Sequence, residues 1–205
     1  MVVSRAGTNI DAHGFAVGRA ARGERSGSWM TPRPVLDHGL AVMREVARGT
    51  DATPIFSAAA WALDAAAEPG SAVCDRWYGP GSLLRADALT PEPWGPSCAT
   101  QGGPLGSLVA GPVWLNPPYD QFAPFAERAV VEAERLWVGW LSFARTDTRA
   151  FQALWWSSRL RGFAFLPGRV RFVDPTTGLR GQAAPAPSVF LVLGPGNADA
   201  VRVRW

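Results

Sequence analysis

The sequence of 205 residues lacks lysine, and it contains only two cysteines and two histidines. Cys74 and Cys98 are too few for a disulfide framework, and with His13 and His38 they form no pattern typical of a zinc site. No apolar run approaches the roughly 18 residues that a membrane span needs, and the N-terminal residues lack the apolar core of a signal peptide. We therefore expect a cytoplasmic protein with free thiols, no metal and no membrane segment.

Because lysine is absent, every basic side chain is an arginine, and the arginines are unevenly distributed. There are seven arginines and four acidic residues in residues 1–50. The middle, residues 51–144, has four arginines and ten acidic residues, and the C-terminal part, residues 145–205, has nine arginines and three acidic residues. A basic C-terminal third beside an acidic middle favours a protein that lays one face on a polyanion and binds a small cation elsewhere. The alternative is that the arginines reflect genome composition and are ordinary solvated side chains.

The order of apolar segments predicts one α/β domain. Residues 1–28 are polar and aperiodic and predict a disordered tail, followed by a domain over 29–205. Helical spacing is found over 34–47 and 122–135 and after Asp147, which we expect to cap the third helix. Residues 95–111 predict a loop or an insertion. Strands are expected at 55–63, where the alanines also allow a helix, and at 113–115, 136–143, 163–166, 170–173 and 189–193. Strands that alternate with helices predict a sheet with crossovers, closed by antiparallel strands late in the chain.

The most informative motif is Asn116-Pro117-Pro118-Tyr119. It follows the apolar run 113–115, and its prolines end the predicted strand, which places the motif where open α/β sheets bind ligands. The asparagine side-chain oxygen and a proline carbonyl are two acceptors for one planar amino group, and the tyrosine ring can lie flat on a heterocycle. The motif therefore predicts methylation of an amino nitrogen, with an ordinary turn after a strand as the alternative.

Other segments accompany this motif in a fixed order: Thr31-Pro32, Leu63-Asp64-Ala65-Ala66, Asp87-Ala88-Leu89 with Trp94, residues 144–148 with Phe151, residues 168–172, and residues 188–191. On these residues, the chain over about 29–194 resembles the phage-type DNA N6-adenine methyltransferases, the Dam-like family. The resemblance implies the class I methyltransferase fold, a mostly parallel seven-stranded sheet with helices on both faces. It also implies S-adenosyl-L-methionine as cofactor, double-stranded DNA as substrate, and a phage or restriction-modification setting.

The resemblance assigns cofactor-binding roles to Thr31, Pro32, Asp64, Ala65, Asp87 and Ala88. The Thr31-Pro32 segment would close over the methionine part of the cofactor. Asp64 would face its positive charges, and Asp87 would hold its adenosine half. The alternatives are that Asp64 caps a helix and that Asp87 forms a turn. The chain departs from the family pattern in two places, because alanines 65–67 stand where many methyltransferases have a Gly-x-Gly turn and because residues 95–111 are longer than usual.

The expected reaction is direct methyl transfer to N6 of an adenine that has been flipped out of the duplex. Asn116 and the Pro117 carbonyl would accept the two N–H groups of the amine, Tyr119 would stack on the base, and no general base is required. Sequence preference is expected from the loops 95–111 and 174–187. The arginines that flank predicted strand ends are expected to contact phosphates or a base edge: Arg145, Arg149, Arg169 and Arg171.

The sequence also allows two other functions. The first is methylation of an RNA base or of a protein glutamine, because methyltransferases with these substrates use the same tetrapeptide, although they usually carry a Gly-rich first motif. They also lack the segments found here at 145–148 and 168–172. The second is a catalytically silent DNA-binding relative, which the alanine-rich turn at 65–67 leaves open. Binding of S-adenosylmethionine would separate the silent relative from both kinds of enzyme.

Overall fold

A computed structural model describes residues 29–48, 50, 60–95, 111–197 and 199–205 of the chain. Three predictions fall wholly or largely outside the described residues: the tail, nearly all of the loop 95–111 and most of the strand 55–63. Within the described residues the chain is an α/β protein with three α-helices, a six-stranded mixed sheet and a separate two-stranded hairpin. The helices are α1 (Arg33–Val46), α2 (Phe122–Glu132) and α3 (Arg149–Trp155).

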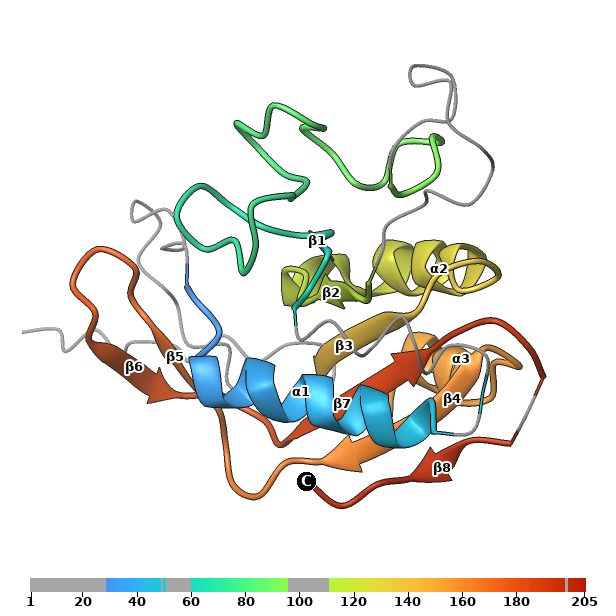
Figure 1. Cartoon of the computed structure of the whole chain (residues 1–205). Coiled ribbons are helices and arrows are strands. Elements are labelled where there is room, and N and C mark those ends of the chain that lie inside the picture. The colour runs from blue at the N-terminus through green and yellow to red at the C-terminus, as the bar shows by residue number, and fades with distance from the viewer. Residues whose placement is uncertain (1–28, 49, 51–59, 96–110, 198) are drawn as a thin grey trace, which may run out of the picture.

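The strands of the larger sheet are ordered β1-β2-β3-β7-β4-β8 (Figure 1). Strands β1, β2 and β3 are parallel, β7 is antiparallel to both β3 and β4, and β8 is parallel to β4. Because β1, β2 and β3 run in one direction, the loops that follow them leave the sheet at one edge. The strand bounds are Leu63–Asp64 for β1, Val113–Leu115 for β2, Val138–Phe143 for β3, Leu160–Phe165 for β4, Ser188–Leu193 for β7 and Val201–Arg202 for β8.

The predicted α/β class is confirmed, but the described sheet is mixed and has six strands, where a mostly parallel sheet of seven was expected. Residues 65–95 form turns and irregular backbone and contribute no further strand. Proline and glycine recur in this stretch, and Gly70 and Gly81 have φ of 83° and 84°, which interrupts any regular ladder. Single backbone bonds hold the stretch to β1 instead, such as Tyr78 N–H to the Asp64 carbonyl at 2.9 Å.

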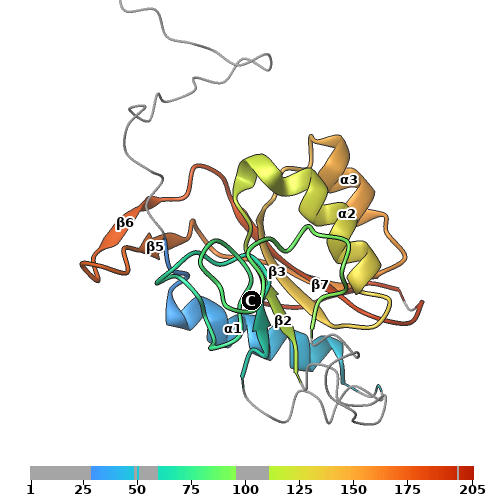
Figure 2. The same ribbon diagram turned by 90° about the horizontal axis from the view of Figure 1, so that it is seen from above.

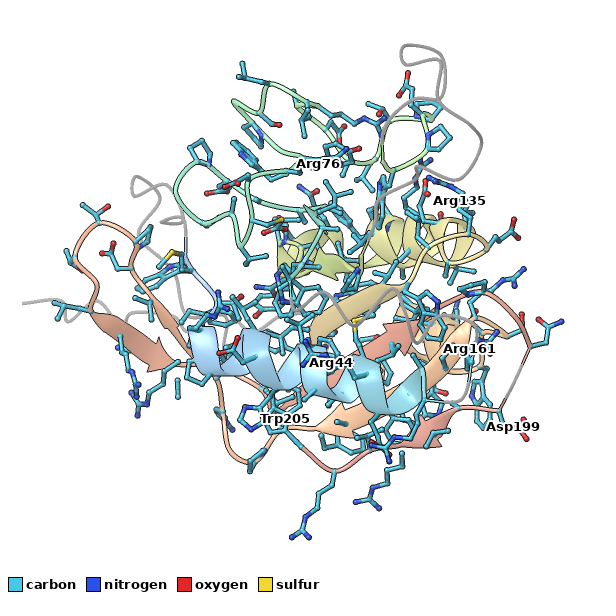
Figure 3. The ribbon with its side chains drawn as sticks, in the orientation of Figure 1. Arg44, Arg76, Arg135, Arg161, Asp199 and Trp205 are labelled. Carbon is cyan, nitrogen blue, oxygen red and sulfur yellow. The ribbon has the colours of Figure 1, made fainter. Side chains whose placement is uncertain are left out.

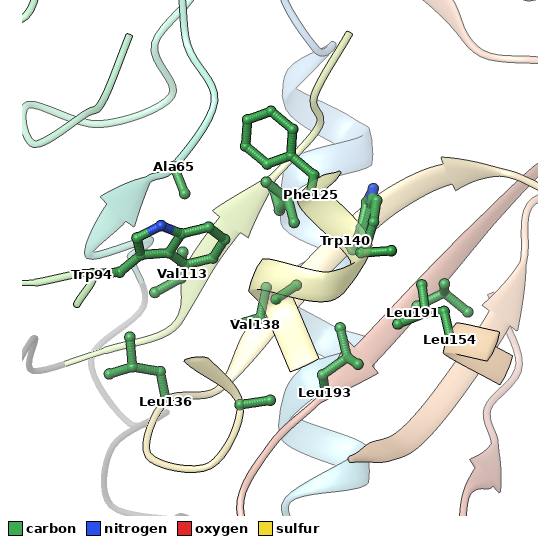
Figure 4. Packing of buried hydrophobic residues seen from close by; sticks show 14 of the residues in the cluster. Ala65, Trp94, Val113, Phe125, Leu136, Val138, Trp140, Leu154, Leu191 and Leu193 are labelled. Carbon is green, nitrogen blue, oxygen red and sulfur yellow. The ribbon is translucent and has the colours of Figure 1, made fainter. Parts of the chain in front are cut away.

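Side chains alternate along the strands, so each face of the sheet has its own apolar core. One core lies between the sheet and helices α2 and α3 (Figure 4), and it includes Val113, Val138, Leu191, Phe125 and Leu154. The other lies beneath α1 and includes Trp114, Leu141, Phe190, Leu40 and Met43. Figure 2 shows α1 on the opposite side of the strands from α2 and α3. Helices therefore cover both faces of the described sheet, as the family resemblance implied.

A buried carboxylate joins the irregular stretch 65–95 to α2. Glu132 is 2% exposed, and its Oε1 accepts a hydrogen bond from the Trp94 N–H at 2.9 Å and lies 2.6 Å from Arg128 Nη2. Arg135, labelled in Figure 3, pairs with the other oxygen and also donates to the Trp94 carbonyl. A buried charge persists only when it is paired in this way. This cluster is one of the contacts that hold the stretch near the edge of the sheet.

Thr148, and not Asp147, caps α3. The Thr148 Oγ1 accepts a hydrogen bond from the Phe151 N–H at 3.3 Å, and Thr148 has the extended backbone of an N-cap. Asp147 instead lies 3.2 Å from Arg145 Nε. The prediction of an Asp147 cap is wrong because the helix begins at Arg149, and a capping side chain belongs to the residue directly before the first helical one.

Two strands were not predicted, β6 (Arg180–Ala183) and β8. Both are short, and β6 also lacks apolar alternation. β6 pairs with β5 (Arg171–Val173) in an antiparallel hairpin that projects from the rest of the domain in both ribbon views (Figures 1 and 2). After β8 the chain returns to α1. There the Trp205 ring, labelled in Figure 3, stacks on the His38 ring with the two ring centroids 5.5 Å apart.

Gly139 of β3 lets α1 approach the sheet closely. A Cβ atom at this position would lie 2.6 Å from Phe190 and 2.7 Å from Met43 Sδ and from Trp61. We expect Gly139→Ala to lower the free energy of unfolding by about 1–3 kcal/mol through overpacking. Urea unfolding measures this, with Ala86→Ser in an exposed loop as the control. Equal stability of Gly139→Ala and wild type would contradict the close packing described here.

Candidate functional site

A cavity of about 440 Å³ lies where the loops after β1 and β2 leave the sheet. The first loop contributes Ala66, Glu68 and Ser71, and the second contributes the predicted motif. Two segments distant in sequence complete the wall, namely Trp29 and the β5–β6 hairpin. The lining residues are Trp29, Ala66, Glu68, Ser71, Asn116, Pro117, Pro118, Tyr119, Asp120 and Phe172.

The two prolines set the backbone of the motif. Strand β2 ends at Leu115, since neither Pro117 nor Pro118 has an N–H for the ladder. The Pro118 carbonyl accepts a hydrogen bond from the Gln121 N–H at 3.0 Å, which begins the short 3-10 helix η2 (Tyr119–Gln121) that leads into α2. Asn116 is thus held just beyond the last ladder position, at the cavity wall.

Asn116 presents an unused acceptor. Its Nδ2 donates to Thr31 Oγ1 at 3.4 Å, whereas its Oδ1 is buried and has no hydrogen-bond partner among the described residues. The carbonyl of the buried Pro117 likewise receives no donor from the described part of the chain. Buried polar atoms are rarely left unpaired in proteins, so an orphaned oxygen at a cavity indicates that a ligand supplies the donor.

Tyr119 is 44% exposed, and its ring stacks on Phe143 with centroids 3.7 Å apart and planes at 20°. Partial burial raises the pKa of its phenol above the usual range, so the group stays neutral. Tyr119 also borders a second cavity of about 250 Å³, whose lining includes Phe143, Arg145 and Thr148. Phe143 was not predicted from the sequence, because an apolar residue at the end of a buried strand has no distinguishing pattern.

The charged residues of the described cavity wall, Glu68 and Asp120, are both acidic. Ser71 fixes the turn that carries Glu68, because its Oγ accepts from the Glu68 N–H at 3.0 Å and donates to the Glu68 carbonyl at 3.1 Å. Trp29 and Phe172 add aromatic surface. Acids beside aromatic rings suit a ligand that is cationic. Glu68 and Asp120 were not predicted, and the acidic charge of the middle of the chain was their only sequence signal.

The predicted acidic cofactor residues do not line this cavity. Asp64 is 3% exposed, and its carboxylate accepts hydrogen bonds from the N–H groups of Ala66 at 3.2 Å and Val73 at 3.1 Å. Asp87 accepts from the Leu89 N–H at 2.8 Å, which is the turn-forming alternative, and its neighbour Ala88 is buried in the core. Ala65 is also buried, whereas Ala66 reaches the wall. Direct cofactor contacts for these residues remain predictions.

The N-terminal segment borders the site through Trp29, whereas the predicted cofactor residues Thr31 and Pro32 are not among the residues that line the cavity. Met30 forms an antiparallel bridge with Val173 of β5, and the Trp29 ring packs against Gly181 of β6, where a Cβ atom would lie 2.7 Å from it. Thr31 follows and contacts Asn116, and Pro32 directly precedes α1. The segment therefore joins the hairpin to the motif.

The four predicted DNA-binding arginines lie on two sides of the site. Arg145 follows β3, lines the second cavity and pairs with Asp147, and exposed Arg149 begins α3. Arg169 and Arg171 belong to the approach to the hairpin and to the hairpin itself. Both are exposed, and Arg169 Nη1 donates to the Ala184 carbonyl at 3.4 Å. Their contact with nucleic acid remains a prediction.

Comparison with known proteins gave no match to a protein-family model, to a curated protein or to a solved structure. In the described ranges, three or more His, Cys, Asp or Glu side chains nowhere gather as a metal site would require. None of the helices that the structure describes has the length and apolar character to cross a membrane.

Burial raises the pKa of Asp64 to about 7, partly offset by the N–H groups of Ala66 and Val73. The unfolded chain releases this proton near pH 4, so native Asp64 binds it more tightly. Stability from this group is therefore present below about pH 4 and is lost as the pH rises to about 7. Asp64→Asn should remove this part of the pH dependence.

Urea unfolding between about pH 4 and pH 8 tests this expectation. The difference in unfolding free energy between wild type and Asp64→Asn should change across the window and become constant above it. Asp75→Asn, at an exposed position in the same loop, is the control. Parallel profiles for wild type and Asp64→Asn would show that the native carboxyl titrates normally.

Proposed function

We propose that this protein transfers a methyl group from S-adenosyl-L-methionine to the N6 amino group of adenine in DNA. The observation that carries the proposal is the buried, unpaired Oδ1 of Asn116, a residue that lines the cavity. An amino group that enters the cavity would supply the missing donor. The Pro117 carbonyl, which also lacks a donor from the described residues, would accept the second N–H.

The architecture supports a class I methyltransferase fold. Three neighbouring parallel strands end at one edge of the sheet, the loops after β1 and β2 line the cavity there, and open α/β sheets bind ligands at that edge. Helices cover both faces, and the antiparallel strand β7 comes late in the chain. These features are compatible with the fold that the family resemblance implies, although the described sheet has six strands.

The cavity fits a cationic cofactor. Its volume of about 440 Å³ is within the range of roughly 300–1,000 Å³ that is usual for small-molecule sites. Glu68 and Asp120 would face the positive charges of S-adenosylmethionine, and Trp29 and Phe172 would cover its apolar parts. The cofactor supplies an electrophilic methyl group on a sulfonium. Lining residues that follow β1 and β2, together with the hairpin, would orient the cofactor.

Asn116 and Pro117 would activate the amine. The lone pair of an exocyclic amine is delocalised into the ring, so the nitrogen is a weak nucleophile. Two acceptors placed out of the ring plane draw the N–H bonds toward a tetrahedral geometry and stabilise the positive charge that develops on the nitrogen. Both acceptors are fixed in advance, because the prolines and the end of β2 determine the backbone on which they lie.

Tyr119 would hold the extruded base. Flipping a base out of the duplex costs a few kcal/mol, and stacking on an aromatic ring returns roughly 1–3 kcal/mol. Phe143 covers one face of the Tyr119 ring at 3.7 Å and so fixes its plane. A neutral phenol suits this role, because it adds no charge next to the base.

The charge distribution supports DNA as the polymer substrate. The described charged residues of the cavity are acidic, whereas exposed Arg145, Arg149 and Arg171 belong to the segments around it. An acidic cavity bordered by arginines would accept a small cation inside and phosphates outside. If the substrate is RNA or a protein glutamine, the assay described below will find the methyl label in RNA or in protein and not in DNA.

Asn116→Ala should lower kcat for DNA methylation by about 10²–10³, the usual cost of one preorganised polar contact in a transition state. Affinity for the cofactor should change little. The assay uses S-adenosylmethionine with a labelled methyl group and identifies the modified nucleoside after digestion. Asn197→Ala, at an exposed asparagine, is the matched control.

Methylation of DNA by Asn116→Ala at the wild-type rate would contradict the role of Asn116. Label found only in RNA or in glutamine would replace the proposed substrate while keeping the amino-methyltransferase chemistry. Absence of cofactor binding by the wild-type protein would support a catalytically silent relative.

Arg149→Ala and Arg171→Ala should each reduce the slope of log affinity for duplex DNA against log salt by about 0.9, the value for loss of one phosphate contact. Fluorescence anisotropy at several salt concentrations measures the slope. Arg204→Ala, at an exposed position of the C-terminal segment near α1, should leave it unchanged. Wild-type slopes for both site variants would exclude these arginines from the DNA contact.

A further inference from the structure

Thr31 joins the N-terminal segment to the Asn116-Pro117-Pro118-Tyr119 motif. Its Oγ1 accepts the hydrogen bond from Asn116 Nδ2 at 3.4 Å, although 85 positions separate the two residues. Thr31 is 7% exposed, so little water is available to replace it as a partner. The bond engages the nitrogen of the Asn116 amide, while the oxygen of the same amide stays unpaired.

The orientation of this amide decides what the cavity can bind. The two ends of a carboxamide have nearly the same shape, so packing alone distinguishes them poorly and the hydrogen-bond partners decide. After half a turn about the last side-chain bond, the NH₂ group would take the position of the oxygen. A donor in that position cannot accept the N–H of an incoming amino group, and the proposed chemistry would fail.

Thr31 is well placed to hold the amide, because the backbone on both sides of it is held. On one side, the Met30 N–H donates to the Val173 carbonyl at 2.8 Å, and the Val173 N–H donates to the Met30 carbonyl at 2.9 Å. On the other side, the Pro32 carbonyl accepts the Val35 N–H at 2.9 Å in the first turn of α1. The Thr31 hydroxyl is therefore a fixed reference point for the amide. This hydroxyl can donate as well as accept, so it fixes the position and plane of the carboxamide, and an incoming N–H donor then selects the end that presents the oxygen.

We propose that Thr31 is a positioning residue, which holds the Asn116 carboxamide with its oxygen available to an amino group. This inference rests on the proposed function, and it differs from the cofactor contact that the family resemblance implies for Thr31. The two roles are separable. A positioning role acts on turnover through Asn116, whereas a cofactor contact acts on the affinity for the cofactor.

A double-mutant cycle on the full chain separates them, using Thr31→Val, Asn116→Ala and both together. Valine keeps the shape of threonine and removes the hydroxyl. Thr31→Val should lower kcat roughly ten- to a hundredfold, as expected for a misplaced catalytic group, and should leave the Kd of S-adenosylhomocysteine unchanged. In the Asn116→Ala background it should have little effect on kcat, because the amide that it orients is absent. Thr31→Ser, which keeps the hydroxyl, should restore turnover.

Equal losses of kcat in the two backgrounds, or a raised Kd with unchanged kcat, would overturn the inference and leave the proposed function intact. A loss in Thr31→Ser as large as in Thr31→Val would also overturn it, since the hydroxyl would then be irrelevant. Thermal unfolding curves are recorded first, and the Thr31 variants are then compared at a temperature at which both are folded. Failure of the wild-type protein to methylate DNA would overturn the proposed function, and this inference with it.

Discussion

The end of strand β2 at Leu115 is the constraint on which the site depends. Pro117 and Pro118 have no N–H to continue the ladder, so the chain leaves the sheet with Asn116 just past the last paired residue. Strands β1 and β3 flank β2 in parallel. The loop after β1 therefore meets the motif at the cavity wall, and the residues after β3 lie beside Tyr119. Thr31 then fixes the asparagine from a third direction.

Charge is separated between the interior of the site and its surroundings. Glu68 and Asp120 are the acidic residues of the cavity wall, whereas Arg149 and Arg171 are exposed on α3 and on the hairpin. The buried charge of Glu132 serves structure instead, because it holds Trp94 and two arginines of α2 and its C-terminal turn. A ligand that carries positive charge and a polymer that carries negative charge would thus meet at one edge of the sheet.

The sequence predicted the parts of this structure that rest on strong local patterns. Helices α1 and α2 follow apolar periodicity, and β2, β3 and β7 are continuous apolar runs. β6 and β8 were missed, because their pairing depends on partners distant in sequence. The motif was found because proline and asparagine have distinctive chemistry, whereas Glu68 and Phe143 reach the site only through loop geometry and stacking. Asp64 is a conspicuous acid in the sequence, yet its oxygens bind backbone N–H groups.

The central claim is that the unpaired oxygen of Asn116 accepts an N–H of the target amine. A crystal structure of the protein with S-adenosylhomocysteine and duplex DNA tests it most directly. We expect an extruded adenine beside Tyr119, with N6 at a hydrogen-bond distance of about 2.7–3.2 Å from Asn116 Oδ1. An Oδ1 that is paired with another protein group or with the cofactor, and a cavity without a base, would contradict it.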